Sequence, residues 1–293
     1  MTTGLAILGA GPAGMAAATL AAELGVETAL IDEQASPGGQ IYRGIERPQP
    51  NSPLGPDYLA GRDLAAALRA SRVEYRPNTT LWHIDPDGTL YMESNGRSEV
   101  LTAHRILLAT GAFERPVPIP GWTLPGVVGA GAAQILLKSA DLVPEGRAVL
   151  AGQGPLLYLI AAQLARAGAP PIALLETTPF ENYLAAMRQL DEGWPGRRML
   201  AKGLGLIFAV RRAGIRVRRG VCGLRAIGQR SLERVAWDRG ELAADHLFLH
   251  EGVIPNVQAS LALQLRHDWD EGQLCWRPAL DPWGQPPDHR DCR

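Results

Sequence analysis

The 293-residue chain has few cysteines, and they form no recognisable pair. Cys222, Cys275 and Cys292 lie far apart with no C-x-x-C motif, which argues against a redox disulfide, a zinc ribbon or an iron–sulfur site. The net charge is −1, so no overall field favours nucleic acid or an acidic membrane. We expect a protein that binds no nucleic acid and keeps free thiols in the cytoplasm.

Long apolar runs are also missing. The first 22 residues carry no charge, but Gly9, Gly11, Pro12 and Gly14 interrupt them, and no basic segment precedes them. Prolines and glycines likewise break the uncharged span 116–137. We therefore expect no membrane span in this chain.

The N-terminal region does contain a complete nucleotide-binding pattern. An apolar strand at 5–8 leads into Gly9-Ala10-Gly11-Pro12-Ala13-Gly14, an Ala-rich helix, a second strand at 28–31 and the acid Asp32. Each element stands where a Rossmann-like unit requires it. The alternative is a tight turn between strand and helix that binds nothing.

Each residue type in this pattern has a physical reason. Gly9 permits the tight turn, Gly11 lets a pyrophosphate approach the backbone, and Gly14 lets the helix pack on the strand. The N–H groups at the helix start, around Pro12 and Ala13, attract phosphate. Asp32 can accept hydrogen bonds from ribose hydroxyls, and the adjacent Glu33 could share that role.

A second copy of the pattern begins near residue 148. Gly152 and Gly154 form its turn and Glu176 is its acid, but Leu157 replaces the third glycine. Glu176 offers a ribose contact and disfavours a 2′-phosphate. NAD, another nucleotide or an empty scaffold all remain open for this unit.

Between the copies lie a helical stretch at 62–72 and strand-like runs at 73–75, 79–84, 90–93 and 100–102. These runs predict a small β-meander inserted into the first unit. A buried strand at 105–108 then ends at Thr110 and Gly111, at the mouth of the sheet where ligands bind. The fold class is therefore α/β, with two Rossmann-like units.

Arginines gather late in the chain. They could dock an acidic partner or phosphate, although a solvated face is the simpler interpretation. The cluster comprises Arg197, Arg198, Arg211, Arg212, Arg216, Arg218 and Arg219. The histidines are scattered, and no catalytic residue or metal site is assigned.

Several longer motifs carry a family resemblance that runs from about residue 3 to residue 284. They occupy residues 37–43, 109–116, 120–127, 152–157 and 250–256. With the two glycine-rich units, they resemble the two-dinucleotide-binding-domain flavoproteins. Within these, the chain resembles the FAD-binding (A-type) subunit of opine oxidases, hydrogen cyanide synthase and D-hydroxyproline dehydrogenase.

The resemblance implies FAD in the first unit. The residues implied to surround it are Gly9, Gly11, Gly14, Asp32, Gly39, Gln40, Thr110 and Gly111. It also implies that this subunit passes electrons onward from a second flavoprotein subunit that oxidises an amino or imino acid. A small iron–sulfur subunit is a further partner in some relatives. Leu157 matches this branch rather than nicotinamide reductases.

The resemblance also sets the expected domains. Residues 1–116, with 257–293 as an incomplete return, would form the FAD domain, and residues 117–256 an NAD-like domain. The late Gly-Asp motif of such flavoproteins is missing after Gln285, which predicts a C-terminal truncation and a disordered tail. Two alternatives stay open: an NADH-dependent flavin reductase, and a non-catalytic fragment.

Overall fold

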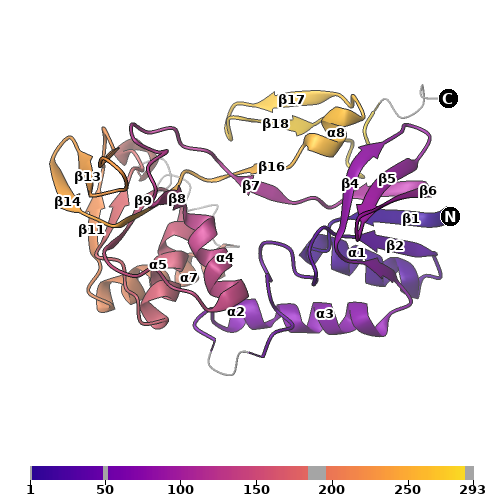
Figure 1. Ribbon diagram of the computed structural model, residues 1–293, viewed down its shortest axis with the longest axis horizontal. Helices are drawn as coiled ribbons and strands as arrows, with labels where there is room; N and C mark the ends of the chain where they lie inside the picture. The colour runs from indigo at the N-terminus through magenta and orange to yellow at the C-terminus, as the bar shows by residue number, and fades with distance from the viewer. Residues whose placement is uncertain (1, 49–51, 184–195, 288–293) are drawn as a thin grey trace. The chain divides into compact units, whose positions relative to one another are not determined.

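A computed structural model describes residues 2–48, 52–183 and 196–287. The chain divides into two compact units (Figure 1). Unit 1 comprises residues 1–113 and 254–293, and unit 2 comprises residues 114–253. The tail expected to be disordered lies largely outside the described residues. Two short strands, β7 (Ala112–Glu114) and β16 (Val253–Pro255), pair where the chain passes between the units.

Unit 1 is built on a six-stranded sheet in the order β3-β2-β1-β6-β5-β4. Its strands are β1 (Thr2–Leu8), β2 (Thr28–Ile31), β3 (Glu74–Arg76), β4 (Thr79–Ile84), β5 (Thr89–Ser94) and β6 (Arg97–Leu108). Its helices are α1 (Pro12–Glu23), α2 (Pro56–Leu59), α3 (Gly61–Ala70) and α8 (Gln258–Ala262), followed by the hairpin β17 (His267–Asp270) and β18 (Cys275–Pro278).

Two details of the predicted meander are wrong. The run near residue 74 is β3, which pairs in parallel with β2 and so belongs to the Rossmann-like sheet. The runs at 100–102 and 105–108 form one strand, β6, because no glycine or proline interrupts residues 97–108. One end of β6 pairs antiparallel with β5, and the other pairs parallel with β1.

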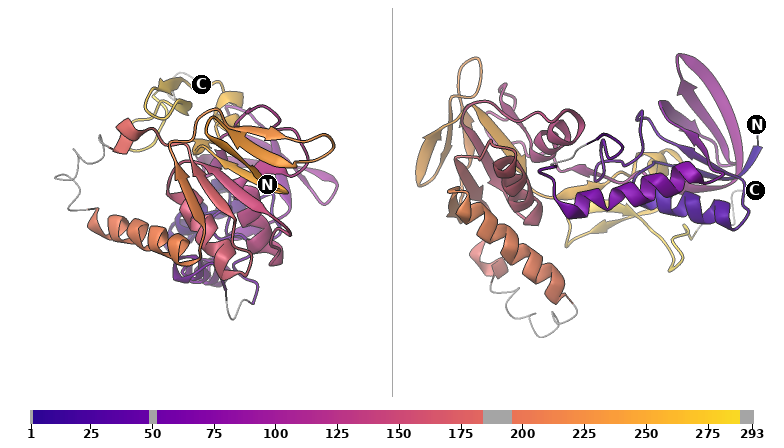
Figure 2. Two further views of the ribbon diagram at one scale, coloured as in Figure 1. Left: turned by 90° about the vertical axis from the view of Figure 1, so that its left-hand side faces the viewer. Right: turned by 90° about the horizontal axis from the view of Figure 1, so that it is seen from below.

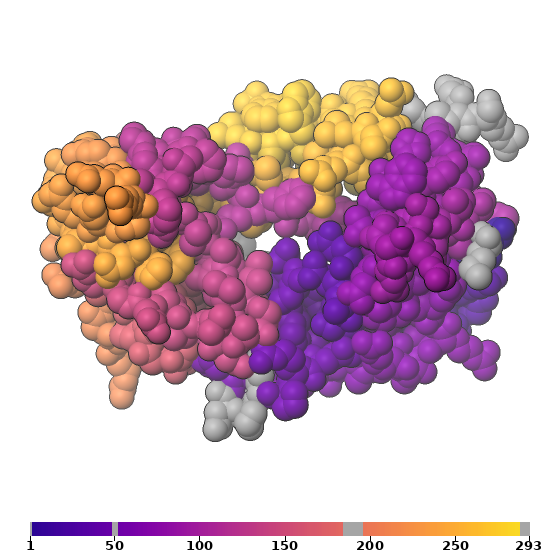
Figure 3. All heavy atoms as spheres, in the orientation of Figure 1, coloured from indigo at the N-terminus to yellow at the C-terminus, as the bar shows by residue number. Residues whose placement is uncertain are grey.

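The two faces of this sheet are covered differently. Helices α1 and α3 lie side by side on one face (Figure 2). On the other face, Leu8 and Ile31 join Leu90 and Met92 in an apolar cluster. Helix α8 contacts β4 there, and this late segment (yellow) lies beside the purple strands in Figure 3. Residues after 254 thus complete the core of unit 1.

Unit 2 has a parallel sheet in the order β11-β10-β9-β15-β8. Its strands are β8 (Val127–Gly129), β9 (Ala148–Gly152), β10 (Ala173–Glu176), β11 (Arg216–Arg219) and β15 (His246–His250). Its helices are α4 (Ala130–Ala140), α5 (Pro155–Arg166) and α7 (Arg197–Arg212). An antiparallel sheet of β12 (Arg225–Ile227), β13 (Arg234–Trp237) and β14 (Gly240–Ala243) packs on the parallel one, and Val149, Leu175, Val235 and Leu247 form part of the core between them.

Candidate nucleotide-binding site

The first glycine-rich turn of unit 1 forms a bare backbone surface. Gly9 has φ +102°, and a Cβ atom there would lie 2.5 Å from the carbonyl oxygen of Ala109. A Cβ atom at Gly14 would lie 1.9 Å from the carbonyl oxygen of Gly9, so no other residue fits without moving the backbone. The structure therefore gives Gly9 and Gly14 the roles that the motif predicts for a tight turn and close packing.

The start of helix α1 faces this turn. Its N-cap is Gly11, which has no side chain, and Pro12 is its first residue. Pro12 has no N–H to lose, so the N–H groups that begin at Ala13 are the first available to a ligand. Such a helix start favours phosphate because the free N–H groups and the helix dipole act together.

The loop at 37–40 crosses the same surface. The N–H of Gly38 donates to the carbonyl of Ala10 at 2.8 Å, and a Cβ atom on Gly39 would come within 2.8 Å of the Gly11 Cα. Gln40 follows and is exposed. The loop and the turn are therefore in backbone contact, which brings Gly39 beside the predicted phosphate position.

Thr110 and Gly111 lie beyond β6, next to the turn. The hydroxyl of Thr110 donates to the carbonyl of Asn256 at 3.1 Å, and the N–H of Asn256 donates back to Gly111 at 2.9 Å. Gly111 has φ +72°. Segment 109–111 is thus fixed by residues that return to unit 1 near the end of the chain.

Asp32 lies at the end of β2 and is 9% exposed. Its two carboxylate oxygens accept the N–H groups of Ala10 at 2.5 Å and Gln34 at 2.7 Å. Burial raises the pKa of Asp32, and these two backbone hydrogen bonds oppose that rise. Each oxygen has a second lone pair for a further donor, such as a ribose hydroxyl. The neighbouring Glu33 is exposed and accepts from the Gln34 amide at 3.1 Å.

Unit 2 repeats the turn but uses its acid differently. Gly152 has φ +135°, and Gly154 is the N-cap of α5, where it has φ +88° and open space around it. Leu157 is fully buried. Glu176 is 5% exposed and accepts the Tyr158 hydroxyl at 3.0 Å.

Arg219 completes this arrangement. Its Nε lies 3.3 Å from the Glu176 carboxylate. Burial raises the pKa of the Tyr158 phenol, and the Glu176 charge and hydrogen bond raise it further. The predicted ribose acceptor of unit 2 is therefore already engaged by two side chains of its own unit.

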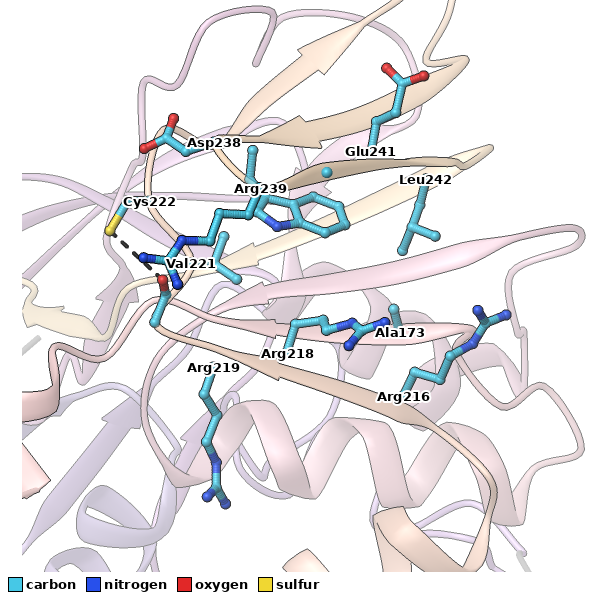
Figure 4. A pocket seen from close by; sticks show the side chains of 13 residues that line it. Ala173, Arg216, Arg218, Arg219, Val221, Cys222, Asp238, Arg239, Glu241 and Leu242 are labelled. Atoms are coloured by element: carbon cyan, nitrogen blue, oxygen red, sulfur yellow. Dashed lines mark hydrogen bonds between the residues drawn. The ribbon is translucent and has the colours of Figure 1, made fainter.

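The predicted arginine cluster separates into two groups. One group lies on α7, and the other lies on β11. Figure 4 shows the β11 group with Arg239 around a cavity of about 530 Å³, whose lining also contains Asp238 and Glu241. Acidic and basic side chains therefore share this cavity.

Glu114 and His250 form a network that no spacing rule predicts, although both lie in the family-like motifs. The Glu114 carboxylate accepts the Gly131 N–H at 2.9 Å, near the start of α4, and lies 2.7 Å from Nδ1 of His250. His250 and His246 have the four-residue spacing of a helical metal pair, but on strand β15 that spacing separates them by about 13 Å. Within the described residues, no group of three potential metal ligands is present.

Among the helices that the structure describes, none has the length and apolar character needed to cross a bilayer.

Known proteins resemble the chain at two levels. Among solved structures, the L-proline dehydrogenase from P. horikoshii has a TM-score of 0.68 at 18% identity, and covers 99% of this chain and 49% of that chain. The T. acidophilum thioredoxin reductase has a TM-score of 0.66 at 17% identity, over 96% of this chain and 85% of that one. These likenesses confirm the α/β fold with its parallel sheets.

Sequence relatives are closer. The A-type subunit of the opine oxidase of Agrobacterium tumefaciens (strain Ach5) is 42% identical over 96% of this chain and 58% of the relative. The hydrogen cyanide synthase subunit HcnB of Pseudomonas aeruginosa is 32% identical over 95% of this chain and 63% of the relative. The chain thus spans less than two thirds of the length of these relatives, and the predicted resemblance is confirmed.

The model of the pyridine nucleotide-disulphide oxidoreductase family matches residues 3–274. That match covers both glycine-rich units and residues 254–274 of the segment that returns to unit 1. The chain belongs to the pyridine nucleotide-disulphide oxidoreductase family.

Proposed function

We propose that the chain is an FAD-dependent oxidoreductase that acts as the electron-transferring subunit of an amino- or imino-acid dehydrogenase complex. The observation that carries this proposal is the cradle in unit 1, where bare glycine backbone, a helix start and a buried acid with unused lone pairs lie together. The similarity to the A-type subunits of opine oxidases supports the class of reaction.

The residues of unit 1 fit FAD. Gly9, Gly11 and Gly14 leave room for a pyrophosphate, and Asp32 is placed to accept ribose hydroxyls. The flavin would supply the redox chemistry, since it can take up a hydride or two electrons. The chain's own contribution is to bind and orient the cofactor and to exclude water from it.

The contacts of Glu176 in unit 2 disfavour the alternative of an NADH-dependent flavin reductase. A nicotinamide nucleotide would need an acceptor for its adenosine ribose, and one of the two carboxylate oxygens of Glu176, Oε2, is already engaged by both Tyr158 and Arg219. Electrons would then reach the flavin from another protein rather than from NADH. A second flavoprotein subunit that oxidises the substrate fits this requirement, and several relatives are named as subunits.

The first test is the visible spectrum of the purified chain after incubation with FAD and removal of unbound cofactor. We expect one FAD per chain, identified after denaturation. A chain that stays colourless would contradict the proposal and favour the non-catalytic fragment.

A second test separates the two redox alternatives. We expect millimolar NADH to leave the flavin absorbance unchanged over minutes, whereas a flavin reductase would bleach it. Rapid bleaching by NADH, lost in a Gly154→Val variant, would overturn the proposed route of electrons.

A further inference from the structure

Three buried side-chain polar atoms have no hydrogen-bond partner among the described residues: Nε of Arg43 and the hydroxyls of Tyr75 and Tyr183. Buried donors without acceptors are uncommon in native proteins, and each one calls for an explanation. Two of the three belong to unit 1 and lie on segments next to Asp32: Arg43 on the loop that follows β2, and Tyr75 on β3, which pairs with β2.

Arg43 approaches Asp32 through Gln34. Its Nη1 donates to the side-chain oxygen of Gln34, whose backbone N–H in turn binds the Asp32 carboxylate. The Arg43 guanidinium lowers the pKa of Asp32, although burial, the largest cause, raises it. The guanidinium therefore lies within electrostatic range of the predicted ribose acceptor.

The backbone holds Arg43 in this place. Its carbonyl accepts the Tyr58 hydroxyl at 2.7 Å, and the N–H of Tyr42 donates to Gly38 at 2.9 Å. A Cβ atom at Gly61 would come within 2.4 Å of the Tyr42 ring, so that ring packs directly on helix α3. Arg43 is thus the fixed end of the same loop that lays Gly39 on the glycine turn.

Tyr75 approaches Asp32 from β3, the neighbour of β2 in the sheet. Burial raises the pKa of its phenol, and the negative charge of Asp32 raises it further. The Arg69 guanidinium lies 5.0 Å from the centre of the Tyr75 ring. The hydroxyl is therefore a neutral, buried donor on the strand next to the one that ends at the acid.

The unpartnered donors of Arg43 and Tyr75, and the unused lone pairs of Asp32, indicate which chemical groups a ligand of this site carries. The ligand must bring acceptor oxygens or nitrogens to the donors and hydroxyl groups to the acid. A charged guanidinium favours an anionic acceptor such as phosphate. An adenosine carrying a 5′-phosphate has all of these groups. FMN also carries hydroxyls and one phosphate, but the acid at the end of β2, bound to the glycine turn through Ala10, occupies the place where a Rossmann-like unit binds the adenosine ribose.

We propose that Arg43 and Tyr75 bind the adenosine-phosphate half of the cofactor, and so make this site select FAD over FMN. This inference rests on the proposed function, because it concerns the same site in unit 1. Arg43 supplies charge-assisted hydrogen bonds to an oxygen of that half, and Tyr75 supplies a neutral one.

The test uses ADP, FAD and FMN as separate probes on the full chain freed of cofactor, with affinities measured by calorimetry. Arg43→Gln should weaken ADP and FAD by the same factor, about tenfold to a hundredfold, and leave FMN unchanged. Arg43→Lys, which keeps the charge, should recover part of that loss. Tyr75→Phe should weaken ADP and FAD by about threefold.

Matched controls are available in the same unit. Arg72→Gln removes an exposed arginine just beyond α3, and Tyr91→Phe removes a phenol on β5 whose hydroxyl binds Asp85. Both should bind all three probes as the unchanged chain does. In thermal melts, a cooperative transition of Arg43→Gln without ligand would show that the variant is folded. The rise in melting temperature that ADP gives should be smaller for this variant than for the unchanged chain, because it binds ADP more weakly.

The outcomes separate this inference from the proposed function. If the unchanged chain binds FAD and ADP but Arg43→Gln binds both within twofold as well, the inference is overturned and the proposed function stands. If Arg43→Gln weakens FMN as strongly as ADP, the selectivity for the adenosine half is overturned. If the unchanged chain binds neither FAD nor ADP, both fail.

Discussion

The two units repeat one pattern of strand, glycine turn, helix, strand and acid, but the acid binds a different kind of donor in each unit. In unit 1, the carboxylate of Asp32 is held by two backbone N–H groups. In unit 2, the carboxylate of Glu176 is held by the side chains of Tyr158 and Arg219.

This difference matters because backbone and side-chain donors leave different space around an acid. Backbone N–H groups of the glycine turn and of Gln34 position Asp32, with lone pairs left for a ligand. In unit 2, by contrast, a phenol and a guanidinium contact Oε2 of Glu176. The same motif can therefore place its acid among backbone donors in one unit and among side-chain donors in the other.

The largest expected effect comes from removing each acid in turn and measuring FAD affinity by quenching of flavin fluorescence. Asp32→Ala should weaken FAD by about a hundredfold, because it removes the ribose acceptor and leaves two backbone N–H groups unpaired. Glu176→Ala should leave FAD affinity within twofold.

Circular dichroism would verify that both variants are folded. Equal losses of FAD in the two variants would break the comparison, since the acid of unit 2 would then serve the cofactor as much as the acid of unit 1 does.

Glu176→Ala should show its effect in stability instead. It leaves the buried Tyr158 hydroxyl without its acceptor and removes the partner of Arg219, so we expect a loss of about 2 kcal/mol in the free energy of unfolding. Arg219 is about half exposed, which limits the loss from the ion pair. Urea unfolding of the chain without cofactor measures it, and Glu33→Ala, an exposed acid, should change stability by less than about 0.5 kcal/mol.

The sequence alone predicts those features that depend on residues close together along the chain. The positions of Gly9, Gly14 and Asp32 along the chain are enough to predict the turn, the helix contact and the acid, because βα units impose fixed spacings. The positive φ of Gly9 and Gly152 follows from the same rule. The two-unit α/β fold could therefore be predicted.

Long-range partners could not be predicted in this way. Arg219, which contacts the Glu176 carboxylate, lies on β11, the strand that pairs with β10. In unit 1, Tyr75 lies on the strand next to the one that ends at Asp32 because β3 joins the parallel sheet, although the sequence favoured a place in the meander. In both units the periodic pattern predicts each strand but not which strand lies beside it.

A smaller effect on stability is expected at Glu114, a second carboxylate of unit 2 whose hydrogen-bond partners lie in the same unit. Its oxygens accept the Gly131 N–H near the start of α4 and approach His250 at 2.7 Å. Glu114→Ala should lower the free energy of unfolding by about 1 to 2 kcal/mol, because a helix cap and a second hydrogen bond are lost. Glu145→Ala, an exposed acid in the same unit, is the control for urea unfolding, and a similar loss there would contradict the assignment.

The smallest expected effect is a pH dependence that comes from Asp32. Burial raises its pKa in the folded chain above its value in the unfolded chain, so the folded state takes up a proton first as the pH falls. Without cofactor, stability from this group should therefore increase as the pH falls through the folded pKa, and be lost again as the pH rises. Measured against Asp32→Asn between pH 7 and pH 4, the difference in unfolding free energy should change with that sign by about 1 kcal/mol or less.

If this contribution to the unfolding free energy instead decreased as the pH falls, the N–H groups of Ala10 and Gln34 would outweigh burial and stabilise the Asp32 anion without any ligand. Unit 1 would then satisfy its acid as completely with backbone donors as unit 2 does with Tyr158 and Arg219. In that case the contrast between the units would lie in the room left for a ribose rather than in how far each acid is stabilised.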